Sequence, residues 1–416
     1  MRCPAGSSTP TGDGFIAGAR ARRVTAQAVV VDGVEAARSL RDLTAREAVD
    51  SEASRTLSAP MVEALWRSGL MQWANPKAAG GSEPSLPEMI DTWIELAWQD
   101  GSVGWVGIAN FPSAAVCAAY LPDEGFKEVF TQHGNRVTAG GQFFPNGLGE
   151  TVDGGYRLTG AWNFGSGTGH SEYVCAGFIA TVQGEMPLGD DGLPRLLVAV
   201  IPREEIVFTD GWHVQGLKGT GSFDYNVQDL FVPAGRTFAL MCQTPLRGES
   251  PTFFMGLIPV TAAGHASWAL GVSKSMLDDV AELAQSKVRM GDAASLAHRD
   301  SFQRNLSHHM AMWKAARLLV VDTFSQVERA VANGEALTPN MRADMRVAAT
   351  YATESSREIV QWAHLAAGTA AIREGSRLER AFRDMYSGTQ HVFIGEKTYT
   401  DAAQVYLGIA GDRLGL

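Results

Sequence analysis

Few residues of the chain stand at spacings that are typical of a catalytic or binding motif. His308 and His309 are neighbours in a segment with helical periodicity, so their side chains point about 100° apart and are not expected to share a metal ion. The glycines of residues 216–221 are spaced somewhat as in a dinucleotide-binding loop, but they lie between predicted strands. P-loop, HExxH, CxxC and GxSxG strings are absent. The sequence therefore predicts no metal site, and these motifs do not identify an activity.

The elements that must position any functional residue follow from the periodicity of apolar residues. The first third of the chain has helical spacing, and Ser85 and Glu88 form a capping box ahead of one of its helices. Residues 136–232 alternate apolar with small or polar side chains between Gly, Pro and Asp clusters, which predicts a small antiparallel barrel or sandwich. After Pro251 long helical segments return, and they predict an antiparallel bundle.

The predicted fold class is therefore α+β, with four segments in order. They are a mobile tail at 1–22, an N-terminal helical domain at 23–135, a middle β-domain at 136–236 and a C-terminal helical bundle at 237–416.

Composition and charge exclude several classes of protein. The 416 residues are 45% hydrophobic and 19% charged, which is typical of a globular chain. A net charge of −10 argues against a nucleic-acid-binding surface. The apolar stretches are shorter than the ~20 residues that a membrane span needs. The four cysteines are scattered without paired spacing, so we expect reduced thiols and a cytoplasmic protein. From the charge and the short apolar stretches we expect neither nucleic acid nor a membrane as a partner.

The order of these parts, together with several local strings, resembles the acyl-CoA dehydrogenase fold. Within that fold the chain is most similar to the oxygenase components of two-component flavin-dependent monooxygenases, and its pattern is nearest to the hydroxylases that act on a secosteroid phenol. The resemblance extends from about Ala45 to Leu414. It rests on Asp100–Trp105, Val152–Tyr156, Gly160–Gly167, Gly216–Ser222, Asp229–Pro233 and Arg380–Asp384, followed by His391.

This resemblance implies an enzyme that uses reduced flavin and oxygen. A separate NAD(P)H:flavin reductase would supply FMNH2 or FADH2 by diffusion, and O2 would form a C4a-hydroperoxyflavin that hydroxylates a small aromatic, most simply phenolic, molecule. That intermediate needs a hydrogen bond at flavin N5 and exclusion of bulk water. The family also implies a homotetramer whose flavin sites straddle subunits.

The resemblance assigns the residues around the flavin as well. Ser166 stands where a hydroxyl reaches N5, although it also suits an ordinary strand end. Trp162 and Phe164 are expected to wall off the isoalloxazine ring. Basic residues at a helix end would contact the flavin phosphate, but they equally suit the helix dipole. The further expected contacts are Gln142, Phe143 and Pro145 in one loop, Gly219 and Thr220 in its companion, and Lys287, Arg289 and Gly368 on the phosphate side.

His391 is the residue that the resemblance assigns to catalysis, together with Ser166. The dehydrogenases of this superfamily carry a catalytic glutamate in the corresponding segment, whereas residues 385–390 contain no carboxylate. A neutral imidazole beside a phenol can accept its proton or hold its oxygen. The substrate side is expected to include Trp105, Ser113, His170 and His391.

Two departures and three alternatives remain at this point. Ser113 replaces a histidine of the nearest relatives and Gln142 replaces a serine, so the substrate can differ from the secosteroid phenol. An FAD-dependent acyl-CoA dehydrogenase would need a carboxylate, and its other usual position, within 256–263, is also empty. A member of the fold that oxygenates nitrogen or sulfur, and a flavin-sequestering scaffold without activity, are the remaining alternatives.

Overall fold

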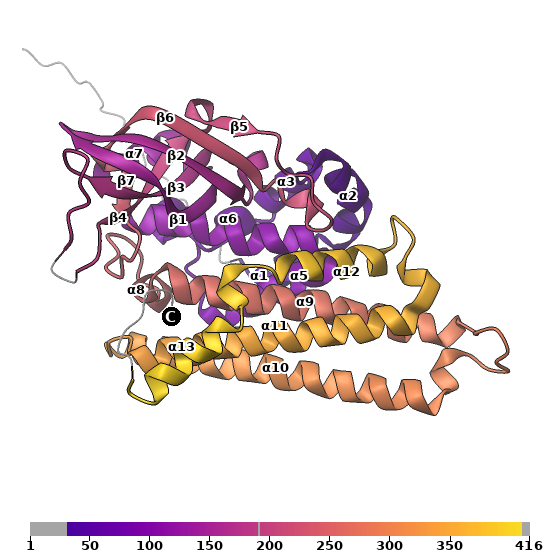
Figure 1. Ribbon diagram of the computed structural model, residues 1–416. Helices are drawn as coiled ribbons and strands as arrows, with labels where there is room; N and C mark the ends of the chain where they lie inside the picture. Colours follow the sequence, from indigo (N-terminus) through magenta and orange to yellow (C-terminus); the bar gives the residue numbers. More distant parts are fainter. Residues whose placement is uncertain (1–30, 190–191, 410–416) are drawn as a thin grey trace, which may run out of the picture.

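The computed structural model describes residues 31–189 and 192–409, and the tail predicted at 1–22 lies outside them. Helices come first, then a sheet, then long helices (Figure 1). The helices ahead of the sheet are α1 (Gly33–Arg38), α2 (Arg41–Ser54), α3 (Ala59–Arg67), α4 (Leu70–Trp73), α5 (Leu86–Gln99), α6 (Gly101–Tyr120) and α7 (Asp123–Val129).

Side-chain caps begin several of these helices as the sequence predicts. Ser85 and Glu88 form the capping box in both directions at α5, and Ser58 Oγ accepts from the amide of Met61 at α3. The α7 helix starts at Asp123, although Pro122, not Asp123, is its N-cap residue. The helix start predicted at α5 is thus confirmed.

The α6 helix is apolar on all sides because the protein surrounds it. Among the described residues it is the one helix long and apolar enough to cross a membrane, and 94% of that window is buried inside the protein. Its side chains contact both the sheet and the bundle, so α6 lies between the two (Figure 1). A core helix of this kind can carry functional side chains to either neighbour.

The middle of the chain forms one seven-stranded sheet in the order β5-β6-β2-β1-β3-β4-β7. The pairs are antiparallel, except that β1 and β3 run parallel, which differs from the wholly antiparallel prediction. Since β7 pairs with β4, we propose that the β-domain continues to Ala239 rather than ending at 236. The strands are β1 (Ala139–Val152), β2 (Gly155–Gly165), β3 (Tyr173–Thr181), β4 (Leu196–Pro202), β5 (Val207–Thr209), β6 (Phe223–Pro233) and β7 (Thr237–Ala239).

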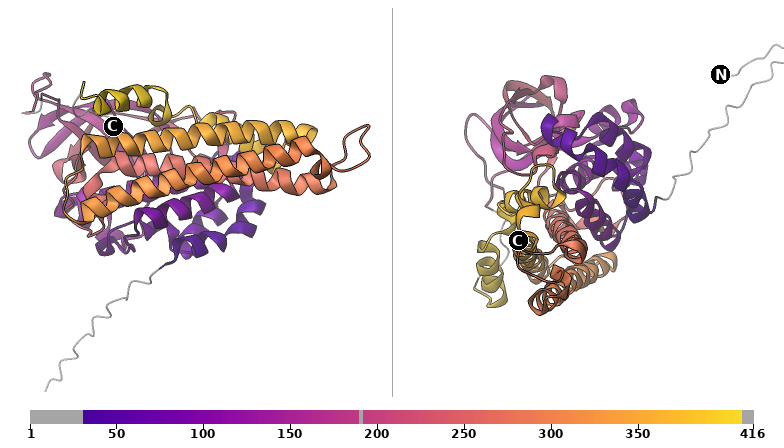
Figure 2. Two further views of the ribbon diagram at one scale, coloured as in Figure 1. Left: turned by 90° about the horizontal axis from the view of Figure 1, so that it is seen from below. Right: turned by 90° about the vertical axis from the view of Figure 1, so that its right-hand side faces the viewer.

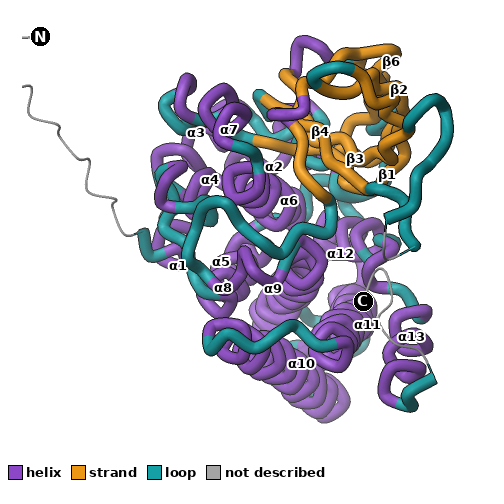
Figure 3. Tube along the Cα trace, turned by 90° about the vertical axis from the view of Figure 1, so that its left-hand side faces the viewer, coloured by secondary structure: helices purple, strands orange, loops and turns teal. Residues whose placement is uncertain are grey.

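Long helices follow and lie side by side (Figure 2). They are α8 (Pro251–Met255), α9 (Leu257–Ser286), α10 (Asp300–Ala332), α11 (Pro339–Ala367), α12 (Arg377–Gly388) and α13 (Lys397–Tyr406). The α9 helix packs against α5, α6 and α11, which joins the first helical region to the bundle in one hydrophobic core. A second, separate core lies within the sheet. Figure 3 shows the sheet at one end of this helical body.

Candidate active site

Ser166 lies directly after β2, and two hydrogen bonds fix its hydroxyl group. Trp105 Nε1, from α6, donates to Ser166 Oγ at 2.9 Å, and Ser222 Oγ donates to it at 3.1 Å. The chain therefore places this hydroxyl between the end of the sheet and the core helix α6.

Trp105 joins Ser166 to two histidines. Its ring centroid lies 5.1 Å from that of His265 on α9 and 6.0 Å from that of His391, which follows α12. Trp268 packs edge-on against the same indole at 5.1 Å. Three residues predicted for the site, Ser166, Trp105 and His391, are thus brought together from three distant segments.

Gly388, the last residue of α12, makes room for this arrangement. A Cβ atom there would lie 2.3 Å from the ring of Trp268 and 2.9 Å from the ring of Trp105. Such approaches are too close for a packed interior. Trp268 cannot easily yield, because its Nε1 donates to the carbonyl of Gly101 at 2.8 Å. A glycine at this position lets Trp105 reach Ser166.

His391 is a half-buried imidazole with one nitrogen in a hydrogen bond. The amide of Phe393 donates to His391 Nδ1 at 3.3 Å, and the two rings are stacked with centroids 5.6 Å apart. Burial, with the positive charge of Arg346 as a second cause, lowers the pKa of His391 to about 4. The ring is therefore neutral at neutral pH.

His265 is a site residue that the sequence reasoning missed. Its side chain is 4% exposed, and its ring centroid lies 4.1 Å from that of His391. Burial lowers the pKa of His265 well below its usual value, and His391 and Arg346 lower it further. The available signal was a single imidazole in a run of small and apolar residues, two positions after the carboxylate-free stretch 256–263.

The two predicted flavin-wall residues do not share a face. Trp162 is fully buried in the sheet core, where it stacks on Tyr225 at 5.3 Å and donates to the carbonyl of Gly177. Phe164 has φ +58° within a register shift of β2, and its side chain is 64% exposed. The left-handed residue breaks the strand's alternation. The apolar surface beside Ser166 therefore belongs to Phe164, and Trp162 packs within the sheet.

The loop predicted to approach the flavin is an irregular stretch of β1. The β1–β3 register shifts between Gln142 and Gly147, and this stretch holds the half-buried Phe143 and Pro145. The amide of Gln142 donates to Tyr225 Oη at 2.9 Å, and its side-chain oxygen accepts from Asn146 at 3.0 Å. These contacts hold the bulge to the sheet without using the exposed ring of Phe144.

The companion loop, residues 216–222, is tied to α6 and α12. Gly219 N donates to Ser102 Oγ at 3.2 Å, and the Thr220 and Ser222 hydroxyls lie 2.6 Å apart. Asp384 Oδ1 accepts from Leu217 N at 2.6 Å. The loop is thereby fixed beside Ser166.

With this arrangement established, the comparisons with known proteins identify the family. The model "Acyl-CoA dehydrogenase, C-terminal domain" matches residues 263–396. Indole-3-acetate monooxygenase of Acinetobacter baumannii is 30% identical over 353 residues, covering 85% of this chain and 88% of the relative, and that of Pseudomonas putida is 29% identical over 354 residues, covering 85% and 88%. The chain belongs to the oxygenase components of flavin-dependent monooxygenases.

Solved structures agree with the fold of this monooxygenase family. The 3-HSA hydroxylase from Rhodococcus sp. RHA1 superimposes with a TM-score of 0.84 at 22% identity, covering 92% of this chain and 99% of that one. XiaF from Streptomyces sp., solved in complex with FADH2 and glycerol, gives a TM-score of 0.84 at 23% identity, covering 92% and 97%. The predicted acyl-CoA dehydrogenase-like architecture is thus confirmed.

The cluster differs from a dehydrogenase site in its titratable groups. The acids of α12 are engaged elsewhere, because Arg383 donates to Glu379 Oε2 at 2.9 Å and Asp384 binds the 216–222 loop. Within the parts of the chain that the structure describes, no group of three or more His, Cys, Asp or Glu residues is placed to hold a metal ion. The cluster thus offers the imidazoles of His265 and His391 and the hydroxyl of Ser166 for chemistry.

Lys287, Arg289 and Gly368 lie together but apart from this cluster. Lys287 Nζ donates to the carbonyl of Ala367, and Arg289 donates to that of Ala366 at 3.3 Å. Both cations therefore cap the C-terminal end of α11 and favour the helix-dipole interpretation within one chain. Gly368 adopts φ +56° at this end.

Among the described residues, no hydrogen bond or ring contact joins His391 to the other two predicted substrate residues, His170 and Ser113. His170 Nδ1 lies 3.3 Å from Thr56 Oγ1, and burial lowers the pKa of His170 to about 4. Ser113 is buried on α6, eight residues beyond Trp105.

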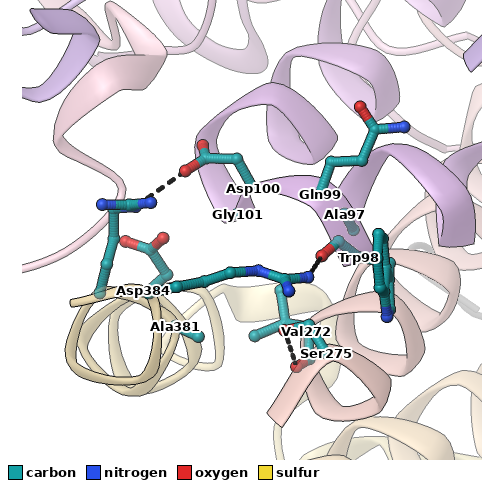
Figure 4. Close-up of a pocket in the computed structure, with 11 residues that line it drawn as sticks. Ala97, Trp98, Gln99, Asp100, Gly101, Val272, Ser275, Ala381 and Asp384 are labelled. Atoms are coloured by element: carbon teal, nitrogen blue, oxygen red, sulfur yellow. Dashed lines mark hydrogen bonds and ion pairs between the residues drawn. The ribbon is translucent and has the colours of Figure 1, made fainter. Parts of the chain in front are cut away.

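A pair of buried acids supports α6 and the 216–222 loop. Asp100 caps the start of α6 and accepts from Arg380 Nε at 2.9 Å. Asp100 and Asp384 line one small pocket, which Figure 4 shows. Burial, with the Asp100 charge next, raises the pKa of Asp384 to about 8.

The raised pKa of Asp384 predicts a pH dependence of stability. Folding favours the protonated acid, so this contribution is complete below about pH 4 and is lost as the pH rises towards 8. In Asp384→Asn the group carries no charge, and we expect the free energy of unfolding of the variant, relative to the parent, to increase from pH 5 to pH 8. Urea unfolding at several pH values measures this difference, with the exposed Asp322→Asn as the matched control. A flat difference would contradict the assignment.

Proposed function

We propose that this monooxygenase hydroxylates a small aromatic molecule that carries an O–H or N–H group, using reduced flavin delivered by a separate NAD(P)H:flavin reductase. The observation that carries the proposal is the meeting of Ser166, Trp105 and His391 at a point without a free carboxylate. Relatives named p-hydroxyphenylacetate 3-hydroxylase and FADH(2)-dependent resorcinol hydroxylase, both oxygenase components, support the substrate class and the need for a reductase.

The residues present fit a flavin ring on the Ser166 side. Phe164 offers an exposed aromatic face, Ser166 offers a fixed hydroxyl, and Gly140 permits close approach of backbone, since a Cβ there would lie 2.7 Å from Ser166 O. Reduced FMN or FAD, when bound, supplies an activated oxygen atom from O2. Ser166 then holds the edge of the ring, while Trp105 keeps that hydroxyl in position and excludes water.

His391 faces the substrate from the other side of Trp105. Its neutral ring can hold the oxygen of a phenol and orient the ring carbon that reacts.

We propose a homotetramer in the cytoplasm as the working form. A surface hollow of about 330 Å³ lies between α10, α11 and α13. Leu318 and Leu319 are exposed on α10, which suits contact with a second copy. Lys287 and Arg289 would reach the flavin phosphate of a neighbouring subunit.

The free thiols of Cys117 and Cys175, whose sulfur atoms lie 3.5 Å apart, suit a reducing compartment such as the cytoplasm.

The test is product formation from a substrate panel. Protein is mixed with chemically reduced flavin and oxygen, and products are analysed by mass spectrometry for the gain of one oxygen atom. We expect a hydroxylated phenol or indole, and no product when oxygen is omitted. Electron transfer from an acyl-CoA to FAD, with no oxygenated product from any aromatic compound, would refute the proposal.

The Ser166 hydroxyl gives a further prediction. In Ser166→Ala the hydrogen bond to the flavin edge is lost, and we expect the fraction of oxygen released as hydrogen peroxide to rise roughly 3- to 10-fold, the size of one hydrogen bond. A peroxide assay run beside product analysis measures this fraction. Ser307→Ala, on the exposed face of α10, is the control. Equal peroxide release by both variants would rule out this role.

A further inference from the structure

The hydrogen bond from Phe393 decides which nitrogen of His391 carries the proton. His391 Nδ1 accepts from the Phe393 amide at 3.3 Å, so the neutral ring must be protonated at Nε2. An imidazole in this tautomer is a donor on its other side. It can hold a substrate oxygen, but it has no lone pair left to accept a substrate proton.

His265 is in the opposite situation. No hydrogen bond to either of its ring nitrogens is present among the described residues, and its Nδ1 is enclosed without a partner. A buried polar group without a partner is destabilising, and in a native protein such a group calls for an explanation, of which a functional role is one. A neutral imidazole always keeps one lone pair, so His265 can accept where His391 cannot.

The surroundings keep that lone pair available. The rings of Trp105 and Phe393 pack against His265, and Trp268 packs edge-on against Trp105. The nearby charge is Arg346 of α11, which donates to Phe393 O at 2.7 Å and lies 4.6 Å from the Phe393 ring centroid. Burial lowers the pKa of His265 well below its usual value, and His391 and Arg346 lower it further. The ring therefore remains an acceptor throughout the neutral range.

We propose that His265 contacts the substrate and accepts a hydrogen bond from the O–H or N–H group on its aromatic ring, while His391 donates from Nε2 to a substrate oxygen. This assignment rests on the proposed function, because it takes the cluster as the place where an aromatic molecule binds. The feature that His265 would recognise is a hydrogen-bond donor attached to an aromatic ring. Phenols and indoles both supply it, and only the phenol also offers an oxygen to His391.

The experiment compares donor compounds with their methylated counterparts. Isothermal titration calorimetry on the flavin-free protein measures binding of phenol against anisole and of indole against N-methylindole. We expect the parent to prefer the donor by about tenfold in each pair, which corresponds to one buried hydrogen bond of about 1.4 kcal/mol. In His265→Phe both ratios should fall to about 2 or below. A steric effect of the methyl group would persist in this variant, so the two explanations separate.

His391→Phe is the matched variant. It removes a hydrogen-bond donor, and methylation of either compound removes only a hydrogen-bond donor of the ligand, so both members of each pair are affected alike. Its ratios should stay near those of the parent. His265→Leu, which cannot overpack the cluster, gives a second measurement if His265→Phe fails to fold by circular dichroism, and the same fall is expected.

A preference that survives in the His265 variants, or a parent without preference, would overturn the assignment. Preference without any hydroxylated product in the reduced-flavin assay would instead refute the proposed function and leave the His265 contact intact.

Discussion

Replacing His391 with alanine is expected to reduce hydroxylated product at least about 100-fold while flavin reoxidation continues, so that the oxygen consumed appears as hydrogen peroxide. The reason is the loss of the Nε2–H donor that orients the substrate's oxygen, and a misplacement of about 1 Å at a reacting centre can cost about 100-fold in rate. Product analysis and a peroxide assay under single-turnover conditions separate the two outcomes.

Two variants sharpen this experiment. His391→Gln keeps an amide donor and should lose less activity than His391→Ala. His309→Ala is the control, because His309 likewise packs against an aromatic ring, that of Trp362 with ring centroids 4.5 Å apart, but on α10. Because the pKa of His391 is about 4, protonation of this ring does not affect the parent between pH 6 and pH 8, and the ratio of parent to His391→Ala should be constant there. Parent-like product from His391→Ala would contradict the role.

Replacing Arg380 with methionine is expected to lower the free energy of unfolding by about 3–5 kcal/mol, the usual cost of breaking a buried ion pair from one side. The side chains of Arg380 and Asp100 are 9% and 4% exposed, and their ion pair is 2.9 Å long. Without the guanidinium, the carboxylate that caps α6 is left buried beside Asp384. Urea unfolding followed by circular dichroism measures the change.

The matched control is Arg317→Met, which breaks the partly exposed pair with Asp91 and should cost no more than about 1 kcal/mol. The double variant Arg380→Met with Asp100→Asn should recover part of the loss, since the unpaired charge is gone. A loss below about 1 kcal/mol in Arg380→Met would show that the pair does not hold α6 in place.

Much of the architecture could be predicted because its signals are local. The capping box at Ser85 and the periodic apolar stripes of α9, α10 and α11 depend only on neighbouring residues. The α6 helix lies within the region predicted to be helical, but its own bounds had no local signal. It is buried on every side, so its apolar residues show no period, and Gly104 and Pro112 within it are poor helix formers.

Features that depend on distant pairing could not be predicted in this way. The parallel pair joins β1 and β3, which come before and after β2 in the sequence and are neighbours in the sheet. The residue pattern of a strand does not indicate the direction in which it pairs. The expectation that Trp162 and Phe164 share a face assumed a regular strand, and the positive φ of Phe164 breaks that alternation.

The site itself was only partly predictable. Ser166, Trp105 and His391 came from resemblance, and the structure gathers them. No nearby residue in the sequence marks His265 as a site residue. It can be recognised only in the fold, where α9 and the segment after α12 bring its ring centroid 4.1 Å from that of His391.

The missing Cβ of Gly388 has a practical meaning for anyone who reshapes this pocket by laboratory evolution. Even alanine at 388 would displace the rings of Trp268 and Trp105, so we expect most members of a library that varies this position to lose the hydrogen bond from Trp105 to Ser166. Ser113 and His170 are better positions to vary, because no hydrogen bond or ring contact joins either of them to Trp105 among the described residues.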